Sequence, residues 1–377
     1  MFIEIREDIV EDAIDKKEMS TNDSLDLLIK FSYCAQAGKH VVTVPCLNNS
    51  ELIKQLCSVM PKRNVEMLLA SKKIRYQLKA IKSHVSIYAI ITYQEIVPTE
   101  GVIVVNPQKR KYFEPYSESR VLTEHINDSM FFRYLVRFYL KDSGIGKWRF
   151  YFEPAMGAGS TTADVLSNII KEEKYFCLTI ADGDKKYPTS DYGETANKIK
   201  DIMEAEMPFN CDYYIMDNVT EIENLIPIKI LNKIVPRRGY RRILGLDFSF
   251  YDMKKGLTLD GIYDDNICNY WRNILVAVGI SFSQRDNAKN NSTGSETYKA
   301  YIRQHKYQEI LCLGFGSDLL DMCVESPKTR SKTAHLDMDY EFSKINREDL
   351  TDAQYKEWIS IGKKMFSWTC GMKPRRA

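Results

Sequence analysis

The chain has 377 residues, of which 44% are hydrophobic and 28% are charged, with a formal net charge of +2. This is ordinary globular composition, long enough for two or three domains, and its core is large enough that folding needs no disulfide or metal staple. The near-neutral charge does not by itself indicate a nucleic-acid binder. No apolar run reaches the roughly 18 residues of a membrane span, so no membrane partner is expected.

The nine cysteines include no C-x-x-C pair, which argues against a zinc ribbon or a thioredoxin-like motif. Their number is odd, and no secretory apolar region follows the charged N-terminus. We therefore expect reduced thiols and a cytoplasmic location.

Residues 1–145 have the pattern of an α+β domain. The expected elements are a helix over 24–37, a strand over 40–46, a basic helix over 64–84, strands over 85–93 and 101–107 joined as a hairpin, and a helix over 121–140. The glycine-containing segment 141–147 follows them and is the clearest boundary in this half of the chain.

Residues 146–238 alternate short apolar strands with helices. Strands are expected over 148–153, 175–182 and 211–217, and helices over 160–174, 193–207 and 221–234. This order is typical of an α/β fold with a mostly parallel sheet and helical crossovers. The remaining region, 239–377, is expected to be mainly helical, with helices over 264–279 and 349–366 and polar loops over 286–297 and 325–335. It would complete the catalytic domain or contact substrate or a partner.

Acidic residues gather where these three strands are expected to end. The first strand ends in Glu153, the second leads into Asp182 and Asp184, and the third is followed by Glu221 and Glu223. Ligands of parallel α/β sheets bind outside the carboxyl ends of the strands. Carboxylates crowded there repel one another unless a cation lies between them, and oxygen ligands suit Mg²⁺ or Mn²⁺.

A D-x-D pair alone is a weak signal, and a second copy at 337–339 has no apolar strand before it. The turn after Glu153 adds Gly157 and Gly159, with Ser160 or Thr161 expected to cap the next helix. A helix N-terminus in that place suits a phosphate, although an ordinary glycine-rich turn explains the pattern equally well. The chain contains no Walker A sequence.

The Glu, D-x-D and Glu-Ile-Glu-Asn steps over Arg149–Ile234 resemble the TOPRIM domain, most closely that of the OLD-type (overcoming lysogenization defect) nucleases. In this chain Pro154 follows Glu153, where the family often has glycine. The ATPase half of OLD-type proteins is absent, so the resemblance implies a separate ATPase or sensor protein as partner, and a homo-oligomer is a further expectation.

The resemblance implies a metal-dependent nuclease that cleaves DNA or RNA, including tRNA, in anti-phage defence or a toxin-like system. Asp182 and Asp184 would bind the principal ion, and Glu153 would be a ligand or the base for the attacking water. The pair Glu221 and Glu223 would hold a second ion or orient the first. A lysine near the scissile phosphate would neutralise charge, and the candidates are Lys254 and Lys255.

Two further hypotheses stay open. A D-x-D glycosyltransferase would bind the metal of a nucleotide sugar, but it leaves the two glutamate motifs unexplained. A non-catalytic module on the same scaffold would act by binding a partner. Basic segments at 71–82, 109–111, 236–242 and 373–376 either follow phosphates or form solvated faces.

Overall fold

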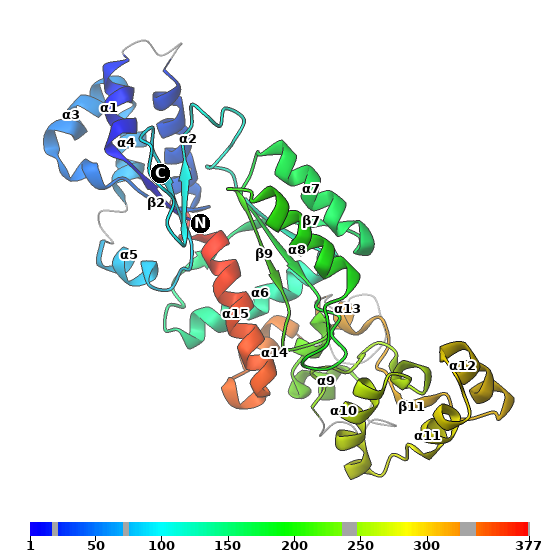
Figure 1. The fold of residues 1–377 in the computed structure, drawn as a ribbon. Coiled ribbons are helices and arrows are strands. Elements are labelled where there is room, and N and C mark those ends of the chain that lie inside the picture. Colours follow the sequence, from blue (N-terminus) through cyan, green and yellow to red (C-terminus); the bar gives the residue numbers. More distant parts are fainter. Residues whose placement is uncertain (17–21, 71–74, 236–246, 325–336, 376–377) are drawn as a thin grey trace. The chain divides into compact units, whose positions relative to one another are not determined.

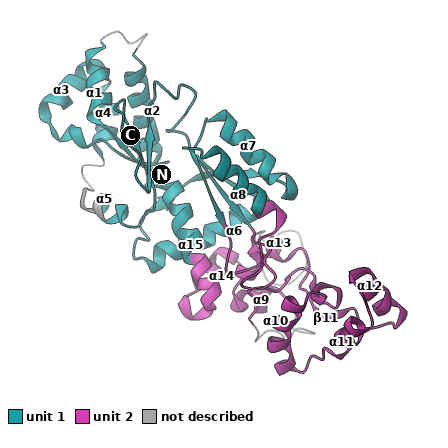
Figure 2. Ribbon diagram, in the orientation of Figure 1, with its two compact units in different colours: residues 1–181, 197–214, 359–377 teal, residues 182–196, 215–358 magenta. Residues whose placement is uncertain are grey.

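The computed structural model describes residues 1–16, 22–70, 75–235, 247–324 and 337–375, and it has an α/β fold with parallel sheets, as predicted (Figure 1). Two compact units can be separated (Figure 2). Unit 1 contains Met1–Ala181, Asn197–Tyr214 and Ile359–Ala377, and unit 2 contains Asp182–Ala196 and Ile215–Trp358. These units do not follow the expected ranges 1–145, 146–238 and 239–377.

The first sheet of unit 1 has four parallel strands in the order β2-β1-β3-β4. The strands are β1 (Phe2–Ile5), β2 (Val41–Thr43), β3 (Tyr88–Ile91) and β4 (Val102–Val105). The predicted hairpin between the last two is wrong, because Tyr88 pairs with Val102 and Ile91 with Val105 in parallel register. The connecting segment 92–101 is long enough to return along such short strands, so it does not form a tight turn.

Helices connect and cover this sheet. They are α1 (Glu7–Asp15), α2 (Asp23–Ala37), α3 (Ser50–Val59), α4 (Lys62–Leu69) and α5 (Arg75–Lys82). The helix predicted over 64–84 corresponds to α4 and α5, and residues 71–74 between them lie outside the described residues.

The second sheet of unit 1 has the parallel order β7-β5-β8-β9. Its strands are β5 (Ser119–Thr123), β7 (Phe152–Met156), β8 (Cys177–Ala181) and β9 (Cys211–Ile215). The helix predicted over 121–140 is therefore wrong at its start, and α6 covers Ile126–Asp142. Val121 and Leu122 are fully buried between two neighbouring strands, and a short apolar run does not by itself distinguish a buried strand from a helix.

Two amphipathic helices, α7 (Thr162–Glu172) and α8 (Glu194–Glu206), pack their apolar side chains on this second sheet. Leu166 and Ile170 of α7 and Ile199 of α8 share one core with Leu122 and Cys177 of the strands. A two-stranded antiparallel pair, β6 (Arg149–Phe150) with β12 (Cys370–Gly371), joins the end of the chain to unit 1. The preceding helix is α15 (Asp352–Thr369).

Unit 2 is rich in short helices and has one antiparallel strand pair. Its elements are the 3₁₀ helix η5 (Ile222–Leu225), α9 (Ile228–Ile234), β10 (Gly256–Thr258), α10 (Asp265–Leu275), α11 (Ser283–Asn290), α12 (Ser295–Gln304), β11 (Ile310–Leu313), α13 (Leu319–Val324) and α14 (Met338–Ser343). The loop predicted over 286–297 is mostly helical, because Ala288 and Tyr298 anchor α11 and α12 through full burial. The loop predicted over 325–335 lies outside the described residues.

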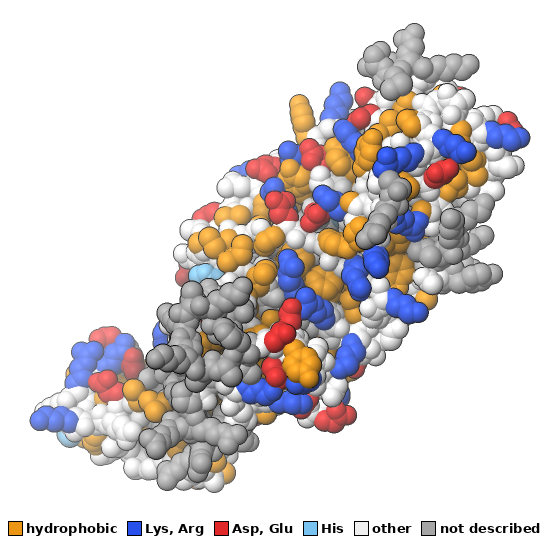
Figure 3. Space-filling view, turned by 180° about the vertical axis from the view of Figure 1, so that it is seen from behind, with side chains coloured by type: hydrophobic (Ala, Val, Ile, Leu, Met, Phe, Trp, Pro, Cys, Tyr) orange, Lys and Arg blue, Asp and Glu red, His pale blue; other side chains and the backbone are white. Residues whose placement is uncertain are grey.

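Hydrophobic, basic and acidic side chains are interspersed on the molecular face of Figure 3. Among the described residues, no helix combines the length and apolar character that a membrane span requires.

Candidate acidic site

The D-x-D motif lies in an irregular segment, here called the D-x-D turn, that begins immediately after β8. Asp182, Gly183 and Asp184 follow Ala181, the last residue of the strand. A side chain at Gly183 would overlap the carbonyl oxygen of Met216, so the turn requires glycine. Asp184 has φ of 54°, a left-handed conformation that aspartate adopts more readily than most residues, and its N–H donates to Thr220 O at 2.8 Å. The turn is thus fixed against the segment that precedes the Glu-Ile-Glu-Asn motif.

A hydrogen bond joins the two acidic motifs within unit 2. The backbone N–H of Ile222, the first residue of η5, donates to Asp182 Oδ1 at 2.9 Å. Ile222 lies between Glu221 and Glu223 in the chain. Asp182 is therefore brought to both glutamates by long-range folding, which the sequence predicted only from the order of strands.

Glu221 and Glu223 are buried, with exposed fractions of 8% and 3%. Lys254 Nζ lies 3.2 Å from Glu221 Oε2 and 3.1 Å from Glu223 Oε1. The other oxygen of Glu221 accepts a hydrogen bond from Met253 N at 3.0 Å. The other oxygen of Glu223 is buried and has no hydrogen-bond partner in the described parts of the chain. One ammonium thus serves two buried carboxylates, which leaves the pair with net negative charge.

Burial and the neighbouring charge of Glu223 raise the pKa of Glu221 to about 7, although Lys254 opposes the rise. For Lys254, burial acts to lower the pKa, but the carboxylates of Glu223 and Glu221 outweigh it and raise the pKa. Asp182 adds to this rise, so the lysine belongs electrostatically to the whole acidic group. The lysine therefore remains charged throughout the physiological pH range.

The two candidate lysines differ in their environments. Asp252 accepts the backbone N–H groups of both Lys254 (3.1 Å) and Lys255 (2.7 Å), which forms a turn. The side chain of Lys254 reaches the glutamates from this turn, whereas Lys255 is exposed. Lys254 is the stronger candidate for a charge-neutralising role.

The expected position of Glu153 at a strand end is wrong. Glu153 is the second residue of β7, which continues to Met156 because its backbone pairs with β5 as far as Thr123. In register, Glu153 is level with Arg120 of β5, which is level with Cys177 at the start of β8. The last residue of β8 lies four residues further along, roughly 13 Å at a strand's rise. Glu153 is exposed, and its carboxylate lies 3.8 Å from Arg120 Nε.

A different glutamate occupies the position that Glu153 was expected to have. Glu124 directly follows Thr123, the last residue of β5, and β5 is the parallel neighbour of β8. Parallel neighbours end at the same edge of a sheet. Sequence reasoning missed Glu124 because residues 121–140 were interpreted as one helix. The apolar stretch "VLT" followed by an acid indicates a strand end, and the helix begins separately at Ile126.

The glycine-rich turn after β7 contains Gly157, Gly159, Ser160 and Thr161. Ala158 and Gly159 have positive φ values of 57° and 65°, so the chain reverses sharply before α7. Thr161 is the N-cap residue of α7, as expected, but its hydroxyl donates to the carbonyl of Gly157 and does not accept from a helix N–H. The N–H of Gly157 itself pairs with Thr123 O at 2.8 Å. These contacts explain the turn without a phosphate.

A buried lysine follows the D-x-D motif, and sequence analysis did not single it out. Lys185 is 7% exposed, and its Nζ lies 2.7 Å from Asp217 Oδ1, which also accepts from the Tyr192 hydroxyl at 2.8 Å. The hydrogen bond with Lys185 is the main cause of the lowered pKa of Asp217. The cluster links the segment after β8 to the segment after β9. No spacing rule in the sequence identifies such a pair.

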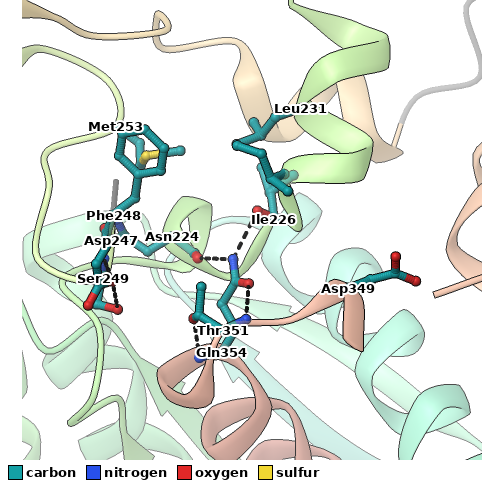
Figure 4. A pocket seen from close by; sticks show the side chains of 11 residues that line it. Asn224, Ile226, Leu231, Asp247, Phe248, Ser249, Met253, Asp349, Thr351 and Gln354 are labelled. Carbon is teal, nitrogen blue, oxygen red and sulfur yellow. Dashed lines mark hydrogen bonds between the residues drawn. The ribbon is translucent and has the colours of Figure 1, made fainter. Parts of the chain in front are cut away.

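A pocket of about 260 Å³ adjoins the acidic group (Figure 4). Its wall includes Asn224 and Met253, the residues that follow Glu223 and precede Lys254. The side-chain amide of Gln354 donates to the carbonyls of Asn224 (2.9 Å) and Ile226 (3.1 Å). Asp247 and Asp349 also line this pocket. These hydrogen bonds hold η5 in place, so the glutamates are presented from a fixed backbone.

The acidic side chains have only part of what a metal site requires. Carboxylate oxygens suit a hard cation, and the unpartnered oxygen of Glu223 is a buried acceptor of the required kind. However, Lys254 already lies between Glu221 and Glu223. Within the described ranges, no group of three or more His, Cys, Asp or Glu side chains is arranged to hold a metal ion. The described side chains are thus not arranged as a metal centre, and an ion at the two glutamates would have to displace Lys254.

No protein-family model, no curated protein and no solved structure matches this chain.

Proposed function

We propose that this chain is a metal-dependent nuclease that cleaves phosphodiester bonds of DNA or RNA, including tRNA. One observation carries the proposal: the carboxylate that directly follows β8, Asp182, is hydrogen bonded to the segment that carries Glu221 and Glu223. A bound cation commonly compensates the repulsion between carboxylates that are held close together. Carboxylates that bind metal ions are typical of phosphoryl-transfer sites.

In this proposal Asp182 and Asp184 hold Mg²⁺ or Mn²⁺, which when bound would polarise the phosphate and acidify a water. We assign to Glu124, which follows strand β5 beside β8, the role that Glu153 was expected to have. Lys254 supplies positive charge to the acidic group. A second ion at Glu221 and Glu223 remains part of the proposal, provided that Lys254 moves.

The TOPRIM resemblance supports this proposal in two ways. The D-x-D motif follows a strand of a four-stranded parallel sheet, and an acid follows its neighbour. From the same resemblance we propose a cytoplasmic effector of anti-phage defence or of a toxin-like system, as a homo-oligomer or with a separate ATPase or sensor protein. A phosphate-binding role is also proposed for the glycine-rich turn, and it requires that the backbone of this turn rearranges. The residues concerned are Gly157, Gly159, Ser160 and Thr161.

Cleavage assays test the proposal. Purified protein with Mg²⁺ or Mn²⁺ is incubated with plasmid DNA, single-stranded DNA and total tRNA, beside the double variant Asp182→Ala, Asp184→Ala. Metal-dependent cutting that the double variant loses supports the proposal, and the cleaved substrate names its class. Cutting that persists in the double variant would contradict the assignment of the site.

One observation favours a second candidate, a non-catalytic interaction module. The salt bridges of Lys254 already balance part of the charge of the glutamate pair, so the fold can hold these acids without a metal. This candidate predicts no cutting of any substrate and no change of thermal stability with Mg²⁺ or Mn²⁺. The D-x-D glycosyltransferase alternative predicts nucleotide-sugar binding, which the same thermal assay with a uridine diphosphate sugar detects.

A further inference from the structure

One pocket of unit 1 brings together residues that are far apart in the sequence. The pocket measures about 490 Å³ and lies between α5, the turn after α6 and the end of the chain. Its lining includes Ala80, Ile145, Lys147, Trp148, Lys373 and Arg375. Its basic residues come from the turn after α6 and from the end of the chain, whereas α5 contributes the uncharged Gln77 and Ala80. The acidic site accounts for none of these residues.

Backbone pairing builds this pocket. Strands β6 and β12 pair antiparallel, with Arg149 opposite Gly371. The residues before β6, Lys147 and Trp148, are therefore close to the residues after β12, Met372 and Lys373. Gly371 cannot carry a side chain, because it would overlap the carbonyl oxygen of Gly38. Hydrogen bonds from Met372 N to Gly38 O and from Arg375 N to Gln36 O, both 2.9 Å, hold the terminal segment. The basic side chains are thus presented from an ordered backbone.

The described residues that line this pocket include three cations and no acid. Lys147, Lys373 and Arg375 line it, and its lining residues include no Asp or Glu. Lys147 and Lys373 are exposed. In contrast to this pocket, the surface of Figure 3 mixes both signs of charge. A concentration of cations without counter-charges favours an anionic ligand.

A second pocket of unit 1, of about 510 Å³, provides the comparison. It also contains basic residues, but Asp23 and Asp26 line it as well. Lys30 lies 2.7 Å from Asp26, and Arg110 forms a bidentate salt bridge with Glu173. Lys30 and Arg110 are thus balanced within the protein, and two aspartates line the pocket, so its preference for an anion is weaker.

Trp148 is the tryptophan that lines this pocket. Of the four tryptophans, Trp271, Trp358 and Trp368 are at most 2% exposed, whereas Trp148 is half-buried and lines the pocket. Cations beside an accessible aromatic ring are the typical combination for single-stranded nucleic acid, in which phosphates meet the cations and an unpaired base stacks on the ring. An acidic peptide would use the charges but not the indole face.

We propose that this pocket binds a single-stranded segment of nucleic acid, with phosphates at Lys147, Lys373 and Arg375 and one unpaired base against Trp148. This proposal adds a binding surface for nucleic acid to the proposed nuclease function. It rests on that function only where the bound strand is taken to be the substrate. Binding itself requires neither a metal ion nor cleavage.

Fluorescence anisotropy tests the proposal with the full chain carrying Asp182→Ala and Asp184→Ala, in EDTA, against labelled 20-mers of deoxythymidine and uridine and a 20-base-pair duplex. We expect tighter binding of the single strands. Lys147→Ala with Lys373→Ala should reduce the slope of log affinity against log salt by about 1.4, since each phosphate contact on a single strand contributes about 0.7. Lys54→Ala, an exposed lysine of α3, is the control and should leave the slope unchanged.

Tryptophan fluorescence gives an independent measurement. Unlabelled deoxythymidine 20-mer should quench the emission of Trp148, and Trp148→Phe should remove that quenching while keeping most of the affinity. Trp148→Ala should weaken binding roughly 5- to 140-fold, the range for one stacked base. Circular dichroism confirms that each variant is folded.

The proposal is overturned if the protein binds no oligonucleotide, or if the double lysine variant keeps the unsubstituted salt slope. It is also overturned if duplex binds as tightly as the single strands. Equal affinity for polyglutamate and single strands would indicate an acidic protein partner instead. Loss of binding with cleavage intact refutes this surface alone. Binding without cleavage in the unsubstituted chain refutes the nuclease proposal alone.

Discussion

The ammonium of Lys254 lies 3.1 Å from one carboxylate oxygen of Glu223, whose other oxygen is buried without a hydrogen-bond partner in the described residues. The same ammonium lies 3.2 Å from Glu221. A single lysine side chain therefore lies between two buried carboxyl groups. This arrangement makes the stability of unit 2 sensitive to the lysine, to pH and to added cations.

Replacing Lys254 with methionine should destabilise the protein by about 1–3 kcal/mol, because it leaves two buried carboxylates without their cation. Lys254 is partly exposed, so this loss of stability is smaller than the loss expected for a fully buried ion pair. Urea unfolding measures the loss. Lys255→Met removes an exposed lysine from the same turn and should change the free energy of unfolding by less than about 0.5 kcal/mol. Equal effects of the two substitutions would contradict the assigned role of Lys254.

Stability should fall as pH rises from about 4.5 to about 7. The folded pKa of Glu221 is raised from its ordinary 4.5 to about 7, so within this window the folded chain holds a proton that the unfolded chain releases. The contribution is at most about 3 kcal/mol. Urea midpoints at pH 5 and pH 8 measure it, and Glu221→Gln should flatten the difference. A variant with an unchanged pH dependence would show that another group titrates in this window.

The two candidate glutamates can be separated by cleavage rates. Glu124→Gln should reduce metal-dependent cutting by at least about 100-fold, because Glu124 follows the strand that neighbours β8. Glu153→Gln should change the rate less than about threefold, since Glu153 is exposed near the start of β7. Single-turnover assays with Mn²⁺ provide the comparison. The opposite ranking would restore Glu153 as the site residue.

Gly183→Ala should disrupt the D-x-D turn, because the added methyl group would overlap Met216 O. Overpacking of this kind costs about 1–3 kcal/mol, and a shifted turn should also reduce cutting. Gly294→Ala is the control: nothing lies within 4 Å of its side-chain position, and its φ of 175° is ordinary extended backbone. Thermal melts and cleavage rates of both variants check the prediction, which fails if Gly183→Ala matches the unsubstituted protein in both.

Metal removal gives a further prediction. EDTA should abolish cutting, and excess Mg²⁺ or Mn²⁺ should restore it. Saturating Mn²⁺ at about 100 times its dissociation constant should raise the free energy of unfolding by about 2.7 kcal/mol, because the ion binds only the folded chain. The Asp182→Ala, Asp184→Ala variant should show no such stabilisation. Equal stabilisation of both proteins would place the ion elsewhere.

Local patterns in the sequence were sufficient for many elements. Helices α2, α7, α8 and α10 and strands β8 and β9 lie where apolar periodicity predicted them. The predicted acids Asp182 and Asp184 do follow β8, because a short apolar run that ends abruptly in two aspartates is typical of a buried strand that leaves its sheet. These features depend on neighbouring residues, so one segment at a time reveals them.

Pairing between distant segments could not be predicted in this way. The sequence contains nothing local that makes β3 and β4 parallel, or that continues β7 past Glu153 to Met156. The interpretation of Val121 as helical hid β5 and with it Glu124. In each case the decisive quantity is burial against another strand, which depends on the whole fold.

The sequence by itself determined the α/β class, most helices and the acids after β8, because amphipathic periods and strand-ending carboxylates are encoded by neighbouring residues. Only the tertiary structure decided that Glu124 follows the strand beside β8, that Lys254 serves Glu221 and Glu223, and that Trp148 meets the basic end of the chain. Strand register and long-range ion pairs depend on the free energy of burying segments together, and no single segment contains that information.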